Sequence, residues 1–180
     1  MAQANVKDAL RSWNRWCETV QTRTIVTRNE TAAQKKARIK HLLADYGSFV
    51  NYYFPHYTDD AKTGKHTECA PFHIKAANAI RKTRNLKYVA EWARGHAKST
   101  HFDVFIPLWL KAQEVRELNV MVLVSKSQEM ANTLLGDIQA ELEYNQRYIA
   151  DFGAQKNEGS WQDGSFVTRD GCAFFARVRG

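Results

Sequence analysis

The sequence predicts a mixed α/β fold built on a parallel sheet. Residues 86–93 alternate and are rich in residues that favour strands, whereas residues 120–124 form a continuous apolar run typical of a strand buried on both faces. Each segment is followed by a stretch with apolar residues at helical spacing. The order strand, loop, helix, strand, helix is typical of a parallel sheet with right-handed crossovers.

The first 57 residues are expected to form a helical arm in front of this sheet. In residues 6–20 the apolar positions lie three or four apart, which predicts one helical stripe. The stripe consists of Val6, Leu10, Trp13, Cys17 and Val20. A second helix is expected over residues 31–49, and Pro55 ends the helical region. Residues 58–67 are polar and read as a loop, so we predict a domain boundary between residues 57 and 58.

The remaining elements belong to the predicted α/β domain, residues 58–180. Further helices are expected over residues 71–80, 98–117 and 127–148. Near the end of the sequence, Asp170 and Gly171 separate two strand-like segments, residues 165–168 and 172–178. An Asp-Gly pair between such segments predicts a β-hairpin.

Composition narrows the classes of function. A chain of 180 residues with 44% hydrophobic and 25% charged residues fits a globular protein and argues against wholesale disorder. No run approaches the roughly 20 apolar residues of a membrane span, and the polar first residues lack the core of a signal peptide. We therefore expect no membrane partner and a cytoplasmic location. The three cysteines are far apart, which argues against a disulfide framework.

The net charge of +7 is concentrated in the first half of the sequence. Residues 1–85 hold 15 Lys/Arg and 7 Asp/Glu, whereas residues 86–180 hold 11 and 12. A basic first half suits nucleic acid or an acidic protein surface, and charge alone does not choose between them.

The loop after the first predicted strand carries the candidate chemistry. Residues 92–100 read W-A-R-G-H-A-K-S-T. A phosphate-binding P-loop needs exposed backbone N–H groups, a lysine for the β- and γ-phosphates, and a Ser or Thr for Mg²⁺. Lys98 and Ser99 fill the last two places. The usual pattern G-x-x-x-x-G-K-[ST] places glycines where this sequence has Trp92 and Ala97.

Without those glycines, the same residues also fit an ordinary strand, turn and helix start. The context favours a P-loop, because a strand is predicted before the loop and an amphipathic helix after it. Gly95 supplies one flexible position, and Arg94 places a planar cation where phosphates would lie. A P-loop NTPase-type sheet with flanking helices and an incomplete core is therefore the predicted fold.

Residues 93–100 resemble the deviant Walker A loop of terminase large subunits, the DNA-packaging ATPases of tailed bacteriophages and prophages. That family commonly carries an arginine and a glycine before a Lys-Ser/Thr pair. Other segments of this sequence also resemble the family, and together they extend the likeness over about residues 50–180. These segments are residues 53–57, 70–73, 122–131, 141–153 and 161–176.

The resemblance implies an ATPase that uses ATP and Mg²⁺. Lys98 would neutralise the β- and γ-phosphates, Arg94 would contact the γ-phosphate, and Ser99 would hold Mg²⁺. Lys98 and Arg94 are thus the implied catalytic residues. The implied nucleotide contacts are Ala93, Arg94, Gly95, His96, Ala97, Lys98, Ser99 and Thr100, with Phe72 and His73 as candidates to meet adenine.

The resemblance also implies a place in a larger assembly. The expected partners are double-stranded DNA, the terminase small subunit and the portal protein of the procapsid, with a ring of identical subunits in the bacterial host cytoplasm. In the family the Walker B strand, the catalytic glutamate, the coupling motif and a nuclease domain would follow Gly180. We therefore expect the chain to bind nucleotide without hydrolysing it efficiently alone.

Other interpretations remain open from the sequence. A helicase-like ATPase would share the P-loop, although helicase motifs are not found. A non-catalytic assembly module would use the basic arm to bind DNA or a protein. His66, Cys69 and His73 form H-x₂-C-x₃-H, but a structural zinc site needs a fourth ligand, so we expect ordinary loop residues there.

Overall fold

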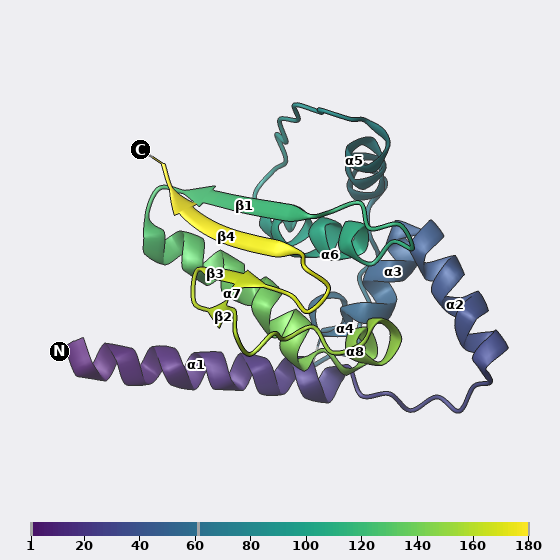
Figure 1. The fold of residues 1–180 in the computed structure, drawn as a ribbon, viewed down its shortest axis with the longest axis horizontal. Coiled ribbons are helices and arrows are strands. Elements are labelled where there is room, and N and C mark those ends of the chain that lie inside the picture. Colours follow the sequence, from purple (N-terminus) through teal and green to yellow (C-terminus); the bar gives the residue numbers. More distant parts are fainter. Residues whose placement is uncertain (1, 61, 180) are drawn as a thin grey trace.

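The computed structural model describes residues 2–60 and 62–179, with side chains from residue 7 onward, and its fold is mixed α/β (Figure 1). The helices are α1 (Ala2–Arg23), α2 (Ala32–Ala44), α3 (Tyr46–Tyr53), α4 (Pro55–Thr58), α5 (Pro71–Lys82), the π-helix η1 (Thr100–Phe105), α6 (Ile106–Lys111), α7 (Gln128–Tyr144) and α8 (Gln146–Phe152). The strands are β1 (Val120–Ser125), β2 (Trp161–Gln162), β3 (Ser165–Val167) and β4 (Ala173–Val178).

Capping side chains explain why two helices expected to be continuous are each divided. Thr31 caps α2 and forms a reciprocal capping box with Gln34. Asp45 then ends α2 and accepts the Ser48 N–H at the start of α3. In the same way, Asn145 ends α7 and caps α8, accepting the Tyr148 N–H at 3.0 Å. Residues such as Asp and Asn bond the backbone locally and so favour helix boundaries.

The helix that follows the candidate loop is widened in its first part. The chain is helical from Lys98 to Lys111, and residues Thr100–Phe105 adopt the π form. Pro107 lies immediately after this stretch, at the start of α6. A proline ring clashes with the carbonyl four residues earlier in a regular α-helix, and a wider turn relieves that clash.

The sheet is small and mixed. Its strand order is β1-β4-β3-β2, in which β1 and β4 are parallel and the other neighbours are antiparallel. The hairpin expected around Asp170 and Gly171 is confirmed, and Gly171 has a φ of 84° that suits glycine. The predicted P-loop sheet was to be parallel. The antiparallel β3–β4 pair is the expected hairpin, whereas the mixed sheet that results, with β2 also antiparallel to β3, is a correction to that expectation.

The strand predicted over residues 86–93 is absent, which is a second correction. Residues 83–97 form neither helix nor strand, and they cross from α5 to η1 as the long loop at the top of Figure 1. Val89 is 82% exposed. Alternation yields a strand only where a neighbouring strand supplies hydrogen bonds, and in the described part of the chain β1 pairs with β4 alone.

The strand over residues 120–125 forms as predicted, but it is not buried on both faces. Helix α7 covers one face, where Leu123, Phe174 and Ala176 are buried. On the other face Val120 and Val122 are 57% and 53% exposed. The apolar run predicted a strand buried on both faces, whereas in the described residues no helix covers this second face.

One hydrophobic cluster joins the arm to the rest of the fold. Phe49 and Tyr53 of α3 are buried in the same cluster as Trp109 of α6 and Tyr148 of α8. Side chains from both sides of the expected boundary after residue 57 therefore share one core, and the division into two domains stays a prediction.

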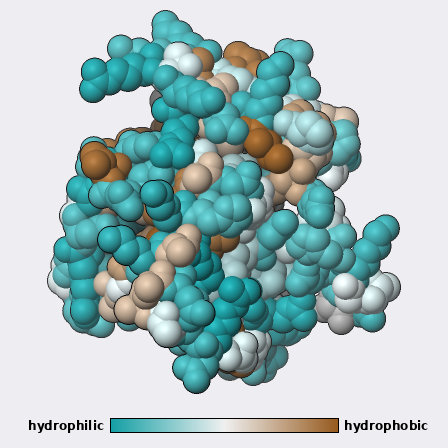
Figure 2. All heavy atoms as spheres, turned by 90° about the vertical axis from the view of Figure 1, so that its right-hand side faces the viewer, coloured by the Kyte–Doolittle hydropathy of each residue, from teal (hydrophilic) through white to brown (hydrophobic). Residues whose placement is uncertain are grey.

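Helix α1 lies along the lower edge of the molecule in Figure 1 and packs on α7. Cys17 and Val20 of the expected stripe are buried, whereas Leu10 is exposed and the Val6 side chain lies outside the described residues. None of the helices in the described part of the chain has both the length and the apolar character needed to cross a bilayer. The face shown in Figure 2 is mostly hydrophilic, with small separate hydrophobic patches.

Candidate nucleotide-binding loop

The loop of residues 93–99, called here the 93–99 loop, contains two left-handed backbone positions. Gly95 has a φ of 87° and Ala97 a φ of 50°. A Cβ built at Gly95 meets no atom within 4 Å, so glycine is favoured there by its backbone angle and not by lack of space. Ala97 is one of two non-glycine residues with positive φ in the described chain, at a cost of about 1–2 kcal/mol.

These angles place two left-handed residues close together. They lie on either side of His96, and left-handed residues that alternate with right-handed ones can turn successive N–H groups toward one concave side. Lys98 begins the helical run directly after Ala97. The first N–H groups of a helix have no intrahelical partner and carry partial positive charge. The sequence here places two left-handed residues directly before a helix N-terminus.

The charged side chains of the loop are free to meet a ligand. Arg94, Lys98 and Ser99 are exposed, and Thr100 is half-buried at the start of η1. In the part of the chain that the structure describes, no ion pair joins Arg94 or Lys98 to a carboxylate. Two unpaired cations and a hydroxyl at a helix start fit the groups that hold phosphate and its Mg²⁺. Ser99 is the residue that would contact the metal ion.

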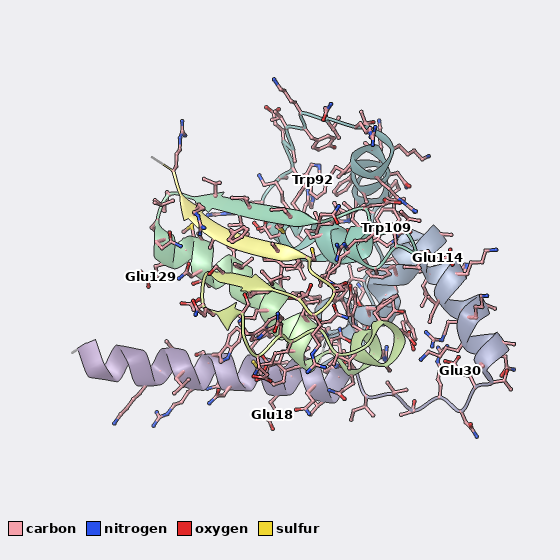
Figure 3. All side chains as sticks on the ribbon, in the orientation of Figure 1. Glu18, Glu30, Trp92, Trp109, Glu114 and Glu129 are labelled. Carbon is pink, nitrogen blue, oxygen red and sulfur yellow. The ribbon has the colours of Figure 1, made fainter. Side chains whose placement is uncertain are left out.

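The two residues expected near adenine lie beside this loop. His73 Nε2 lies 3.0 Å from the His96 carbonyl oxygen and donates to it, while His73 Nδ1 accepts the Ala70 N–H at 3.0 Å. The Phe72 ring lies 5.5 Å from the His96 ring and 5.1 Å from the Trp92 ring. Trp92 is labelled in Figure 3, where it lies between the long loop and α5.

The side chains of Phe72, His73 and Trp92 can stack on a base, but they offer few polar atoms that could recognise it. His73 is buried and both of its ring nitrogens are occupied by backbone partners, whereas Phe72 keeps 37% of its surface exposed. Phe72 is therefore better placed than His73 to stack on a base. His73 instead stabilises the 93–99 loop through its hydrogen bond to the His96 carbonyl.

The histidines and cysteine of the H-x₂-C-x₃-H pattern separate in the structure. His66 pairs with Asp59 at 2.6 Å on an exposed turn, whereas Cys69 and His73 lie close to His101 of η1. Sequence spacing gave no sign of His101, because its approach depends on how the helix after the 93–99 loop packs on α5.

A buried polar cluster next to α1 was also missed by the sequence analysis. His56 Nε2 lies 2.5 Å from Glu141 Oε1, and both side chains are almost completely buried. Burial raises the pKa of Asp137 to about 6, and the charge of Glu141 adds to that rise. Burial likewise raises the pKa of Asp103 to about 6, with a further contribution from Asp137.

The residues of this second cluster lack any shared sequence motif. Asp103 lies in η1 and Asp137 in α7, and only the packing of these two helices brings them together. Their spacing in the sequence carries no signal of that contact.

A mixed α/β fold with a lysine-bearing loop is the class that the structure defines, and comparisons with protein-family models, with curated proteins and with solved structures find no match.

Proposed function

We propose that the chain binds ATP through residues 93–100 and serves as the ATP-binding part of a viral DNA-packaging motor. The observation that supports this most directly is the left-handed backbone at Gly95 and Ala97 immediately before Lys98. Strain at a non-glycine residue persists where the site requires that geometry, and a phosphate nest requires it.

In this proposal each side chain has a separate task. Lys98 meets the β- and γ-phosphates, Arg94 contacts the γ-phosphate, and Ser99 contributes to Mg²⁺ binding. The backbone N–H groups of the loop surround phosphate oxygens. Phe72 stacks on the base, while His73 holds the loop through the His96 carbonyl.

The wider assignment extends the sequence resemblance to terminase large subunits. The proposed partners are double-stranded DNA, a small terminase subunit and a portal protein, with the chain acting in a ring in the host cytoplasm. Hydrolysis needs a second acidic site that positions water and metal, which the family places in later sequence. The proposal for residues 1–180 is nucleotide binding.

A titration with a fluorescent ATP analogue tests the proposal. The wild-type chain is expected to bind saturably and more tightly with Mg²⁺, and Lys98→Ala to bind about 10- to 100-fold more weakly, since charge-assisted hydrogen bonds contribute about 1.5–3 kcal/mol. Lys36→Ala removes an exposed lysine from α2 and serves as the control. Equal affinity of wild type and Lys98→Ala would remove this loop from the site.

A DNA-binding assembly module is a second candidate, favoured by a cluster of arginines around Tyr52. The guanidinium carbons of Arg28, Arg38 and Arg147 lie 5.1, 4.8 and 5.2 Å from the centre of its ring. Arg38 is neutralised by Glu30 and Asp151. Among the described ion pairs none engages Arg28 or Arg147, but Arg147 Nη1 already donates to the Tyr52 carbonyl at 2.7 Å. The exposed Arg28 is therefore the cation available for a backbone phosphate.

Fluorescence anisotropy with labelled double-stranded DNA distinguishes this second candidate. Arg28→Ala should weaken binding and reduce the salt-dependence slope by about 1, as expected for one lost phosphate contact. Arg84→Ala removes an exposed arginine outside the cluster and should leave affinity nearly unchanged. Equal effects of the two variants would argue for nonspecific charge and against a site at Tyr52.

A further inference from the structure

Three potential metal ligands from separate segments meet between α5 and η1. Cys69 lies just before α5, His73 lies in its first turn, and His101 lies in η1. One ligand atom from each residue lies within 4.8 Å of those of the other two. His73 and His101 are buried and Cys69 is half-buried, so the cluster is shielded from bulk water.

The chemical state of both histidines suits metal binding. His73 Nδ1 accepts the Ala70 N–H, so this nitrogen carries no proton, and the His101 ring is buried. Neutral imidazole is the form that donates a lone pair to a metal. Two neutral imidazoles and one thiol form a donor set typical of zinc and its neighbours, not of Mg²⁺ or Ca²⁺.

Outer hydrogen bonds already orient the two rings. His101 Nδ1 lies 2.7 Å from the Tyr46 hydroxyl, which leaves Nε2 without a described hydrogen-bond partner. His73 Nε2 donates to the His96 carbonyl oxygen. Metal-bound histidines commonly use one nitrogen for the metal and the other for a carbonyl, hydroxyl or carboxylate of the protein. His101 matches this arrangement directly.

Coordination requires a modest contraction of the cluster. Zinc bonds of about 2.3 Å to sulfur and 2.0–2.1 Å to nitrogen place tetrahedral ligand atoms roughly 3.5 Å apart. The rings of His73 and His101 are stacked at 3.8 Å, so binding opens that stack. At His73 a coordinate bond replaces one backbone hydrogen bond, whereas Cys69 loses its proton to solvent when the thiolate forms.

We propose that Cys69, His73 and His101 form a binding site for one divalent transition-metal ion of the zinc type, with water in the fourth position. Three protein ligands and an open position permit exchange of the ion. The site is separate from the Mg²⁺ position proposed at Ser99 and does not depend on nucleotide binding. An ion here would link the start of α5 to the helix that follows the 93–99 loop.

Cobalt serves as the spectroscopic probe, because it occupies zinc sites and its bond to thiolate absorbs in the near ultraviolet. The full chain, reduced and freed of metal with a chelator, is titrated with Co²⁺ and then with Zn²⁺. We expect one Co²⁺ per chain, a thiolate-to-cobalt charge-transfer band, and loss of that band when Zn²⁺ displaces the cobalt.

Variants assign the ligands. Cys69→Ser should abolish the charge-transfer band, and His101→Gln should weaken Zn²⁺ binding by at least about tenfold. His66→Ala removes the neighbouring histidine of the sequence pattern and should change neither result. Near-ultraviolet circular dichroism without metal confirms that each variant is folded.

Two results would overturn the proposal. The first is a folded wild-type chain that shows no charge-transfer band with Co²⁺, an outcome that depends on no variant. The second is a band that persists in Cys69→Ser or disappears in His66→Ala, because either would place the thiolate or the imidazole ligand elsewhere. Nucleotide titration is independent of both, so failure here is distinguishable from failure of the proposed ATP site.

Discussion

Two of the segments that contain left-handed backbone, the turn of residues 168–172 and the 93–99 loop, differ in how their backbone polar groups are paired. In the turn of residues 168–172, Thr168 N–H donates to the Cys172 carbonyl at 2.9 Å and Gly171 N–H to the Thr168 carbonyl at 2.8 Å. The Thr168 hydroxyl also accepts the Cys172 N–H. Within the 93–99 loop, the His96 N–H donates a longer hydrogen bond, of 3.4 Å, to the Ala93 carbonyl.

The contrast separates a turn with a structural role from a loop with a proposed binding role. Backbone polar groups are almost always paired when buried, and the 168–172 turn satisfies its own. The 93–99 loop keeps comparable backbone angles while it exposes donors and unpaired cations. Strained backbone that leaves its donors unused within the fold points to a ligand.

The largest expected effect tests the anchoring of the 168–172 turn. Asp170 pairs with Lys111 at 2.7 Å, and the Lys111 side chain is 2% exposed while that of Asp170 is 46% exposed. Asp170→Asn should lower the free energy of unfolding by about 2 kcal/mol, less than for a fully buried pair because solvent screens the carboxylate. Urea unfolding at pH 7 measures this, with the exposed Glu158→Gln as control.

The same pair predicts a pH dependence. Burial opposes ionisation of Asp170, but hydrogen bonds from Lys111 and Thr168 outweigh it and lower the pKa of the carboxyl. The stabilisation is then present above the ordinary aspartate pKa of about 3.9 and lost as pH falls through the lower folded-state value. The difference between wild type and Asp170→Asn should shrink on acidification, and a constant difference from pH 7 to pH 2 would contradict the ion pair.

A buried carboxylate without a cation should behave in the opposite way. Burial and Glu141 raise the pKa of Asp137 to about 6, so its ionisation destabilises the fold above that pH and costs nothing below about pH 4. Asp137→Asn should be more stable than wild type by about 1–2 kcal/mol at pH 7 and equal to it near pH 4. Thermal unfolding across this range measures the difference, and a less stable variant at pH 7 would show that Asp137 has an unrecognised partner.

Alanine at the two glycines compares the segments directly. Gly171→Ala and Gly95→Ala each place a Cβ at positive φ, which should cost about 1–2 kcal/mol of stability in both cases. Only Gly95→Ala should also weaken binding of the ATP analogue, because the 93–99 loop alone presents its donors to a ligand. Unfolding and binding titrations, run in parallel, measure the stability and the ATP affinity of each variant. Equal ATP affinities of the two variants would contradict the proposed difference between the 93–99 loop and the 168–172 turn.

The smallest effect is expected from relieving the strain at Ala97. Ala97→Gly permits the φ of 50° without steric cost, but glycine also gains entropy in the unfolded chain. The two effects should nearly cancel, leaving a change within about 0.5 kcal/mol and ATP affinity equal to or above that of wild type. An affinity reduced tenfold would mean that the Ala97 methyl group itself contacts the nucleotide.

Local signals in the sequence predicted local structure well. The Asp170-Gly171 pair located the hairpin and the apolar run located β1, whereas the boundary at Asn145 falls inside a helix that was expected to be continuous. These features depend on turn and capping chemistry within a few residues. Lys98 and Ser99, the last residues of the 93–99 loop, were likewise placed correctly at a helix start.

Features that depend on distant partners were not predictable. Residues 86–93 alternate like a strand but have no neighbouring strand, and the apolar run of β1 gave no sign that one face would be exposed. The meeting of Cys69 with His101 depends on how two helices pack, which no spacing rule encodes. The mixed α/β class and the helix start at Lys98 were therefore accessible from sequence, whereas the sheet order and the cluster of Cys69, His73 and His101 were not.

The parallel pairing of β1 with β4 also determines when the sheet can form during synthesis of the chain. Val120 pairs with Ala173, so a ribosome must synthesise α7, α8 and the β2–β3 hairpin strands before β1 gains its partner. Pairing between distant segments is slow, and unpaired strands are prone to aggregate while they wait. Sheet closure is thus a late step of biogenesis, and the valines of β1 make the nascent chain most vulnerable just before it.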